Sequence, residues 1–229
     1  MFIYTENKKF NMYKKKNTKQ FDNDSEWGTY WEFETIPFIE NYFNKVLNPK
    51  GKKLMFLNEN MSRKVSELKE WDMKYAIIDT FTNQIIKTIT FEIKTDKFEE
   101  SGNLFFEKSC RNKVSGVFAT KADYFIYYLP RYSENNFYIM KPKDLINLIN
   151  QKFPSCLNYG GGDGGRVVSY LITKSTFDSE YTSVKSCKLL TCNIEIPSKF
   201  GMNKFQEKKK YVYYSDTIKT YENPLDNWL

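Results

Sequence analysis

Two neighbouring stretches of sequence decide the fold of this chain, WDMKYAIID at residues 71–79 and IIKTITFEIK at residues 85–94. Both are rich in residues that favour β-strands, and residues 80–84 between them, TFTNQ, predict a short hairpin loop. A loop centred on Thr82 places Asp72 directly opposite Glu92. Directly opposed residues project from the same face of a sheet.

The alternation along these two strands predicts one buried and one outward face. The apolar residues share the odd-numbered positions: Trp71, Met73, Tyr75, Ile77, Ile89, Phe91 and Ile93, with only Lys87 interrupting them. A slip of one residue would turn this whole set to solvent, so the pattern fixes the register. The other face carries Asp72, Glu92 and Lys94, which we expect to look outward from the core.

Two interpretations of this polar face stay open on the hairpin alone. In the first, Asp72 or Glu70 forms an ordinary cross-strand ion pair with Lys94 on a solvated surface. In the second, the two carboxylates and the amine form a site for metal-dependent phosphodiester cleavage. The downstream sequence favours the second.

After a polar connection, residues 102–107 predict a third strand that continues the antiparallel meander. A second hairpin centred between Glu99 and Glu100 would bring Glu107 opposite Glu92. Residues 125–129, FIYYL, have the composition of a buried central strand.

Four segments together resemble the PD-(D/E)XK nuclease superfamily, in particular its small viral and phage-type, restriction-endonuclease-like members. They are Asp72, the triplet Glu92-Ile93-Lys94, Gly102-Asn103 with Glu107, and TKADY at residues 120–124. The resemblance covers residues 26–130, and it departs from the family where Trp71 stands in place of a proline.

This resemblance implies an α/β (α+β) fold with a restriction-endonuclease-like core. The core would be a central mixed sheet with a three-stranded antiparallel meander flanked by helices. It also implies metal-dependent cleavage of DNA, with Asp72 and Glu92 as metal ligands and Lys94 beside the scissile phosphate.

The residue types suit this chemistry. Mg²⁺ (or Mn²⁺) is bound by carboxylate, carbonyl and water oxygens, and Asp72, Glu92 and the carbonyl of Ile93 can supply the protein ligands. A lysine ammonium beside them would stabilise the developing negative charge. The chain has no histidine, which excludes histidine-metal nucleases and Ser-His triads.

A further acidic ligand is expected from the helix that precedes the hairpin, where residues 36–47 carry an apolar helical stripe. The resemblance implies a glutamate that points at the metal, and Glu32 is the first choice and Glu26 the second. The alternative is that both glutamates occupy the solvated face or the start of the helix.

Composition favours a polyanionic partner. The chain of 229 residues has a formal net charge of +7, and basic residues cluster near both ends and after the third strand. The middle cluster is the candidate for contacts with DNA phosphates: Lys108, Arg111, Lys113 and Lys121. A solvated surface is the usual explanation of the two terminal clusters.

We expect one nuclease-like domain at residues 25–203, preceded by a basic N-terminal extension at residues 1–24. Residues 204–229 would be a tail or an arm that packs on a partner subunit, and a homodimer is left open. Within the domain we expect a helix at 141–149, a flexible glycine-rich loop at 160–165, a strand at 167–172 and a short element from 173 to 177.

The four cysteines lack CxxC spacing and are expected to be free thiols. No run is long enough for a transmembrane helix, and the first residues lack the apolar segment of a signal peptide. We therefore expect no membrane partner and an intracellular, cytoplasmic protein, in the host cytoplasm if the chain is viral.

Two functions from different classes follow from the sequence. The first is a Mg²⁺-dependent deoxyribonuclease that serves viral or phage DNA processing, recombination or repair. The second is a non-catalytic nucleic-acid-binding or virion-associated protein that retains the nuclease fold.

Overall fold

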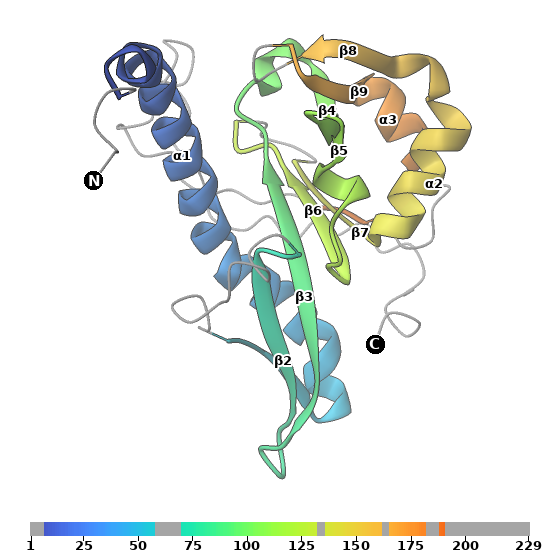
Figure 1. Cartoon of the computed structure of the whole chain (residues 1–229). Helices are drawn as coiled ribbons and strands as arrows, with labels where there is room; N and C mark the ends of the chain where they lie inside the picture. The colour runs from blue at the N-terminus through green and yellow to red at the C-terminus, as the bar shows by residue number, and fades with distance from the viewer. Residues whose placement is uncertain (1–6, 58–69, 132–135, 162–164, 182–187, 191–229) are drawn as a thin grey trace, which may run out of the picture.

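The protein has an α+β fold in which a long helix, a mixed sheet and a second, antiparallel sheet lie side by side (Figure 1). The computed structural model describes residues 7–57, 70–131, 136–161, 165–181 and 188–190, with the backbone alone for residues 7–26, 188 and 189.

The mixed sheet has five strands in the order β1-β2-β3-β6-β7, and the short β10 pairs with the β7 edge. β3 and β6 are parallel, whereas the other neighbours are antiparallel. The strands are β1 (Lys52–Phe56), β2 (Met73–Asp79), β3 (Ile85–Thr95), β6 (Tyr124–Tyr128), β7 (Phe137–Met140) and β10 (Lys188–Leu190).

The predicted register of the β2–β3 hairpin is confirmed. Met73 pairs with Phe91 and Tyr75 with Ile89, and the register shifts only after Ile77, close to the turn. The side chain of Asp79 accepts the first amides of the turn, which fixes the chain reversal. The central strand predicted at residues 125–129 is also confirmed, as every residue of β6 is buried.

The third strand of the meander was predicted wrongly. Residues 102–107 belong to β4 (Asn103–Cys110), which pairs with strands of the second sheet and not with β3. The free edge of β3 is taken by β6, and β1 pairs with β2 to complete an antiparallel β1-β2-β3 meander. Glu107 therefore lies opposite Ser169, and its predicted position opposite Glu92 is wrong.

Helix α1 (Asn7–Leu47) packs on the odd-numbered face of the hairpin and contains Pro37. It is longer than the predicted 36–47 stripe and runs through the boundary expected at residue 24. Trp31, Ile39 and Phe43 are fully buried against Phe91 and the strands beside it. This apolar core is the interior that the alternation of residues 71–93 predicts.

The second sheet packs on the other face of the mixed sheet, together with two helices. Its strand order is β5-β4-β9-β8. The predicted helix at 141–149 and strand at 167–172 are confirmed. The elements are β4, β5 (Lys113–Val114), α2 (Pro142–Lys152), β8 (Leu157–Gly161), β9 (Val167–Thr173) and α3 (Lys174–Tyr181), with single-turn helices η1 (Asn48–Lys50), η3 (Glu99–Ser101), η4 (Gly116–Phe118) and η5 (Pro154–Cys156).

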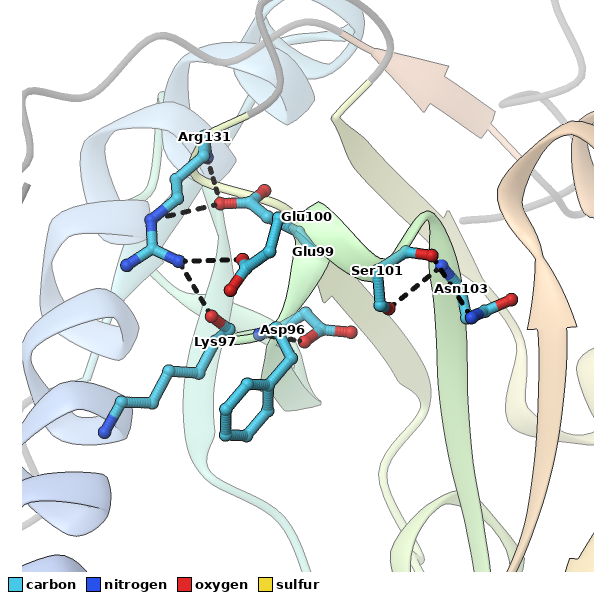
Figure 2. Close-up of polar contacts among 8 residues, drawn as sticks. Asp96, Lys97, Glu99, Glu100, Ser101, Asn103 and Arg131 are labelled. Atoms are coloured by element: carbon cyan, nitrogen blue, oxygen red, sulfur yellow. Dashed lines mark hydrogen bonds and ion pairs between the residues drawn. The ribbon is translucent and has the colours of Figure 1, made fainter. Parts of the chain in front are cut away.

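A polar cluster fixes the chain where it passes from β3 to β4 (Figure 2). The guanidinium of Arg131 donates to the carbonyl of Lys97 at 2.8 Å and to Glu100 at 3.1 Å, and the Arg131 amide donates to buried Glu99 at 2.6 Å. Arg131 also lies over the Trp27 ring at 5.4 Å, so this cluster ties the connection to α1.

Of the four cysteines, Cys156 is a free thiol, Cys110 ends β4, and Cys187 and Cys192 lie outside the described residues. The 204–229 segment and residues 162–164 of the glycine-rich loop also lie outside them. In the helices that the structure describes, no stretch is long and apolar enough to span a membrane.

Candidate functional site

Asp72 and Glu92 lie together where β2 begins and β3 approaches its end. Asp72 extends the hairpin by one residue: its amide donates to the carbonyl of Phe91 at 2.8 Å. Its Oδ2 accepts the amide of Ile93 at 2.7 Å, which holds the Asp72 carboxylate beside the backbone that carries Glu92. The register that predicts these two carboxylates as neighbours is therefore the one that the backbone adopts.

The pKa of Glu92 departs strongly from its ordinary value. The pKa of Glu92 is raised from 4.5 to about 8, first by burial, then by the negative charge of Asp72 and, to a smaller extent, by the charge of Glu32. The charge of Lys94 acts in the opposite direction. Without a cation, Glu92 is mostly protonated at neutral pH, because two adjacent carboxylates in a partly dry site resist sharing a double negative charge.

Thr120 connects the TKADY segment to this carboxylate. Its hydroxyl lies 3.2 Å from Glu92 Oε2 and 2.9 Å from the carbonyl of Glu70, and it accepts the amide of Ala122 at 3.1 Å. A hydrogen bond from Thr120 lowers the pKa of Glu92. The single hydroxyl proton of Thr120 is shared between Glu92 and the carbonyl of Glu70. Thr120 therefore offsets only part of the increase in the pKa of Glu92.

Glu32 comes from α1, and its charge reaches Glu92. Glu32 Oε1 is 3.9 Å from where a Cβ of Gly28 would stand, so the side chain points back along the helix. The backbone of Glu26 is part of α1, but its side chain lies outside the described residues.

Lys94 follows Glu92 on the same face of β3 and is exposed. Its ammonium lies 5.8 Å from the centre of the Phe105 ring on β4. Phe105 is in turn positioned by Tyr127, whose hydroxyl accepts the Phe105 amide at 2.8 Å and donates to buried Asp96. This chain of hydrogen bonds fixes the strand that borders Lys94.

Glu107 is two residues beyond Phe105 and projects from the same face of β4. Its backbone is closely covered by Gly116, where an added Cβ would stand 2.7 Å from the Glu107 carbonyl oxygen. Gly116 has a φ of +55°, so both the space and the backbone conformation require glycine.

The four candidate DNA-binding residues separate into two groups. Lys108, Arg111 and Lys113 share the β4–β5 hairpin, where Arg111 and Lys113 are exposed and Lys108 lies 5.6 Å from the centre of the Tyr170 ring. Lys121 comes from a different segment and forms an ion pair with Glu70 at 2.5 Å.

The donor chemistry of Asp72 and Glu92 fits a hard divalent cation. Both groups offer carboxylate oxygens, and a cation between them would replace the proton that the raised pKa of Glu92 retains. Within the described residues, no group of three or more acidic, cysteine or histidine side chains is arranged to hold a metal ion. A third protein ligand would therefore require a shift of Glu32 or a backbone carbonyl such as that of Ile93.

Sequence reasoning assigned no role to Thr120, Asp96 or Tyr127. The TKADY segment contains Thr120, but a lone hydroxyl has no spacing that predicts its acceptor.

Comparison with known proteins adds no assignment: no family model, no curated protein and no solved structure matches this chain.

Proposed function

We propose that this protein is a divalent-metal-dependent deoxyribonuclease with a restriction-endonuclease-like core. The observation that carries the proposal is the pairing of Asp72 with Glu92, where burial and the Asp72 charge raise the pKa of Glu92 to about 8. A strongly perturbed carboxylate such as Glu92, with a second carboxylate and a lysine beside it, is typical of catalytic sites more than of solvated strand faces.

In this proposal Asp72 and Glu92 hold the cation, with the carbonyl of Ile93 or a shifted Glu32 completing the protein ligands. The bound Mg²⁺ or Mn²⁺ would polarise the phosphate and lower the pKa of a coordinated water. Lys94 contributes a positive charge next to the phosphate, where negative charge develops during cleavage. The amide of Ile93 orients Asp72, and Thr120 orients Glu92.

The electrostatics of the site also support a polyanionic substrate. Lys94 is exposed beside the carboxylates, and the β4–β5 hairpin adds further exposed basic groups on the neighbouring sheet. A DNA backbone bound there would contact lysine and arginine side chains while one phosphate reaches the carboxylates.

The test is cleavage of supercoiled, linear, single-stranded and branched DNA with Mg²⁺ or Mn²⁺. We expect Asp72→Ala to abolish cleavage and Lys94→Ala to slow it by about 10²- to 10³-fold. Lys87→Ala is the matched control, because it removes another exposed lysine of β3 that lies near the turn end of the strand. It should leave the rate unchanged.

If the wild type cleaves none of these substrates, or if Asp72→Ala cleaves as fast as the wild type, the nuclease proposal is wrong. The alternative of a non-catalytic nucleic-acid-binding protein predicts binding of DNA without turnover in the same assay.

A further inference from the structure

The second sheet ends in a hollow that lies outside the Asp72–Glu92 site. It has a volume of about 510 Å³, and the β4–β5 turn and the adjoining ends of β8 and β9 form its walls. Its polar and glycine lining consists of Arg111, Asn112, Tyr159, Gly160, Gly165 and Arg166. Among the lining residues that the structure describes, Arg111 and Arg166 are the charged ones, and both are cationic.

The turn that carries Arg111 is strained for its sequence. Cys110 pairs with Lys113, and the two residues between them, Arg111 and Asn112, have φ angles of +52° and +62°. Two-residue hairpin turns of this kind favour asparagine, aspartate or glycine at both positions, because positive φ is unfavourable for larger side chains. An arginine here weakens the turn, and strain of this kind is typical of functional positions.

The backbone places two arginines of the hollow side by side. The amide of Arg111 donates to the carbonyl of Arg166 at 3.0 Å, so the two arginines leave from directly adjoining backbone. Guanidinium groups bind phosphate oxygens in bidentate geometry, which suits a pair of arginines to a phosphodiester.

Tyr159 supplies the second kind of contact. It lies on β8, which pairs with β9 at Tyr159–Val168, and 71% of its surface is exposed. An aromatic ring left open beside cationic groups is a platform on which an unpaired base can stack. Gly160 and Gly165 have φ angles of +82° and +83°, which favour glycine at both positions, and both line the hollow.

From these contacts we propose that the hollow binds a nucleotide of single-stranded nucleic acid. Arg111 and Arg166 would hold its phosphates, and Tyr159 would stack on its base. A base inside a duplex has both faces covered by its neighbours, so this geometry selects an unpaired strand. The hollow is a binding site separate from the carboxylate pair, and its occupancy needs no metal.

The experiment measures binding of fluorescently labelled oligothymidine by anisotropy, in EDTA so that no cleavage occurs. We expect Tyr159→Ala to weaken binding of oligothymidine by about 10- to 100-fold and to leave binding of inorganic polyphosphate unchanged. Arg166→Ala should weaken binding of both. Lys143→Ala, which removes an exposed charge of α2, is the control for net charge and should change neither.

Arg111→Asn separates binding from folding. Asparagine suits the turn better than arginine, so the variant should melt at a higher temperature than the wild type and yet bind oligothymidine at least about 10-fold more weakly. The proposal is overturned if Arg111→Asn and Tyr159→Ala bind as the wild type does. It is also overturned if a duplex of equal length, or polyphosphate, binds as tightly as oligothymidine. The binding assay contains no metal and measures no cleavage. Its outcome therefore stays interpretable even if the nuclease proposal fails.

Discussion

The charge on Glu92 opposes folding, so Glu92→Gln is expected to stabilise the protein when divalent cations are absent. The folded pKa of about 8 lies above the ordinary value of 4.5. Ionisation of Glu92 therefore costs no stability below about pH 4.5. The loss in free energy of unfolding grows as the pH rises and is complete above about pH 8.

The size of this effect follows from the pKa shift. At 1.36 kcal/mol per pH unit, ionisation of Glu92 reduces the free energy of unfolding by about 3 kcal/mol at pH 7 and about 5 kcal/mol above pH 8. These values are upper limits, because relaxation and water entry reduce the cost of a buried charge. Glutamine retains the shape of the protonated side chain without the charge.

The assay is urea unfolding in EDTA between pH 5 and pH 9, followed by the fluorescence of buried Trp27 and Trp31. The variant should gain stability over the wild type steadily as the pH rises. Adding Mn²⁺ at 100 times its dissociation constant should stabilise the wild type by about 2.7 kcal/mol and the variant far less. Equal stability of the two proteins at pH 8 in EDTA would refute the reasoning.

Asp72→Asn provides the matched control for the origin of the shift. The negative charge of Asp72 is the second cause of the raised pKa after burial. Removing this charge should lower the pKa of Glu92. In proteins that carry Asp72→Asn, the gain in free energy of unfolding from Glu92→Gln should therefore depend less on pH. If Asp72→Asn leaves the stability gained by Glu92→Gln unchanged, burial alone raises the pKa of Glu92.

Three further substitutions test the surroundings of the site. Thr120→Val removes the hydrogen bond that lowers the pKa of Glu92, so the pH profile of cleavage should move to higher pH; a profile that stays in place would count against this contact. Tyr127→Phe leaves buried Asp96 without its hydroxyl donor and should reduce the free energy of unfolding by about 1–3 kcal/mol in urea titrations. Gly116→Ala forces a Cβ to 2.7 Å from a β4 carbonyl at a φ of +55°, and should cost about 1–3 kcal/mol by the same measurement.

The hairpin could be predicted from the sequence because its information is local. A strand that alternates apolar and polar residues has only one register that buries the apolar set, so Met73 and Phe91 had to pair. The same alternation predicts which face α1 covers. The central strand β6 was predictable for a similar reason, since a short aromatic and aliphatic run with no charged residue is typical of a strand that is buried on both faces.

The choice of partner strands was not predictable in this way. Residues 103–110 form a strand as expected, but the pattern of a strand does not say which edge it will join. β1 was missed because its sequence KKLMF buries only Leu54 and so has a weak alternation. The parallel pairing of β3 with β6 depends on the path of the intervening chain, which composition does not encode.

The site was predictable to the same extent as the hairpin. Asp72, Glu92 and Lys94 follow from the register, whereas the contact of Thr120 with Glu92 joins residues that only the tertiary fold brings together. The hollow at the end of the second sheet could not be foreseen for a related reason. Its described lining comes from segments far apart in the sequence, the β4–β5 turn and the residues that flank 162–164, and neither segment alone indicates that the two meet.

The central claim is that Asp72 and Glu92 hold one divalent cation. The most direct measurement is the anomalous density of a crystal soaked in Mn²⁺, recorded for the wild type and for Asp72→Asn. We expect a peak bounded by the Asp72 and Glu92 carboxylates in the wild type and its loss in the variant. A wild-type crystal saturated with Mn²⁺ that shows no density between these two side chains would contradict it.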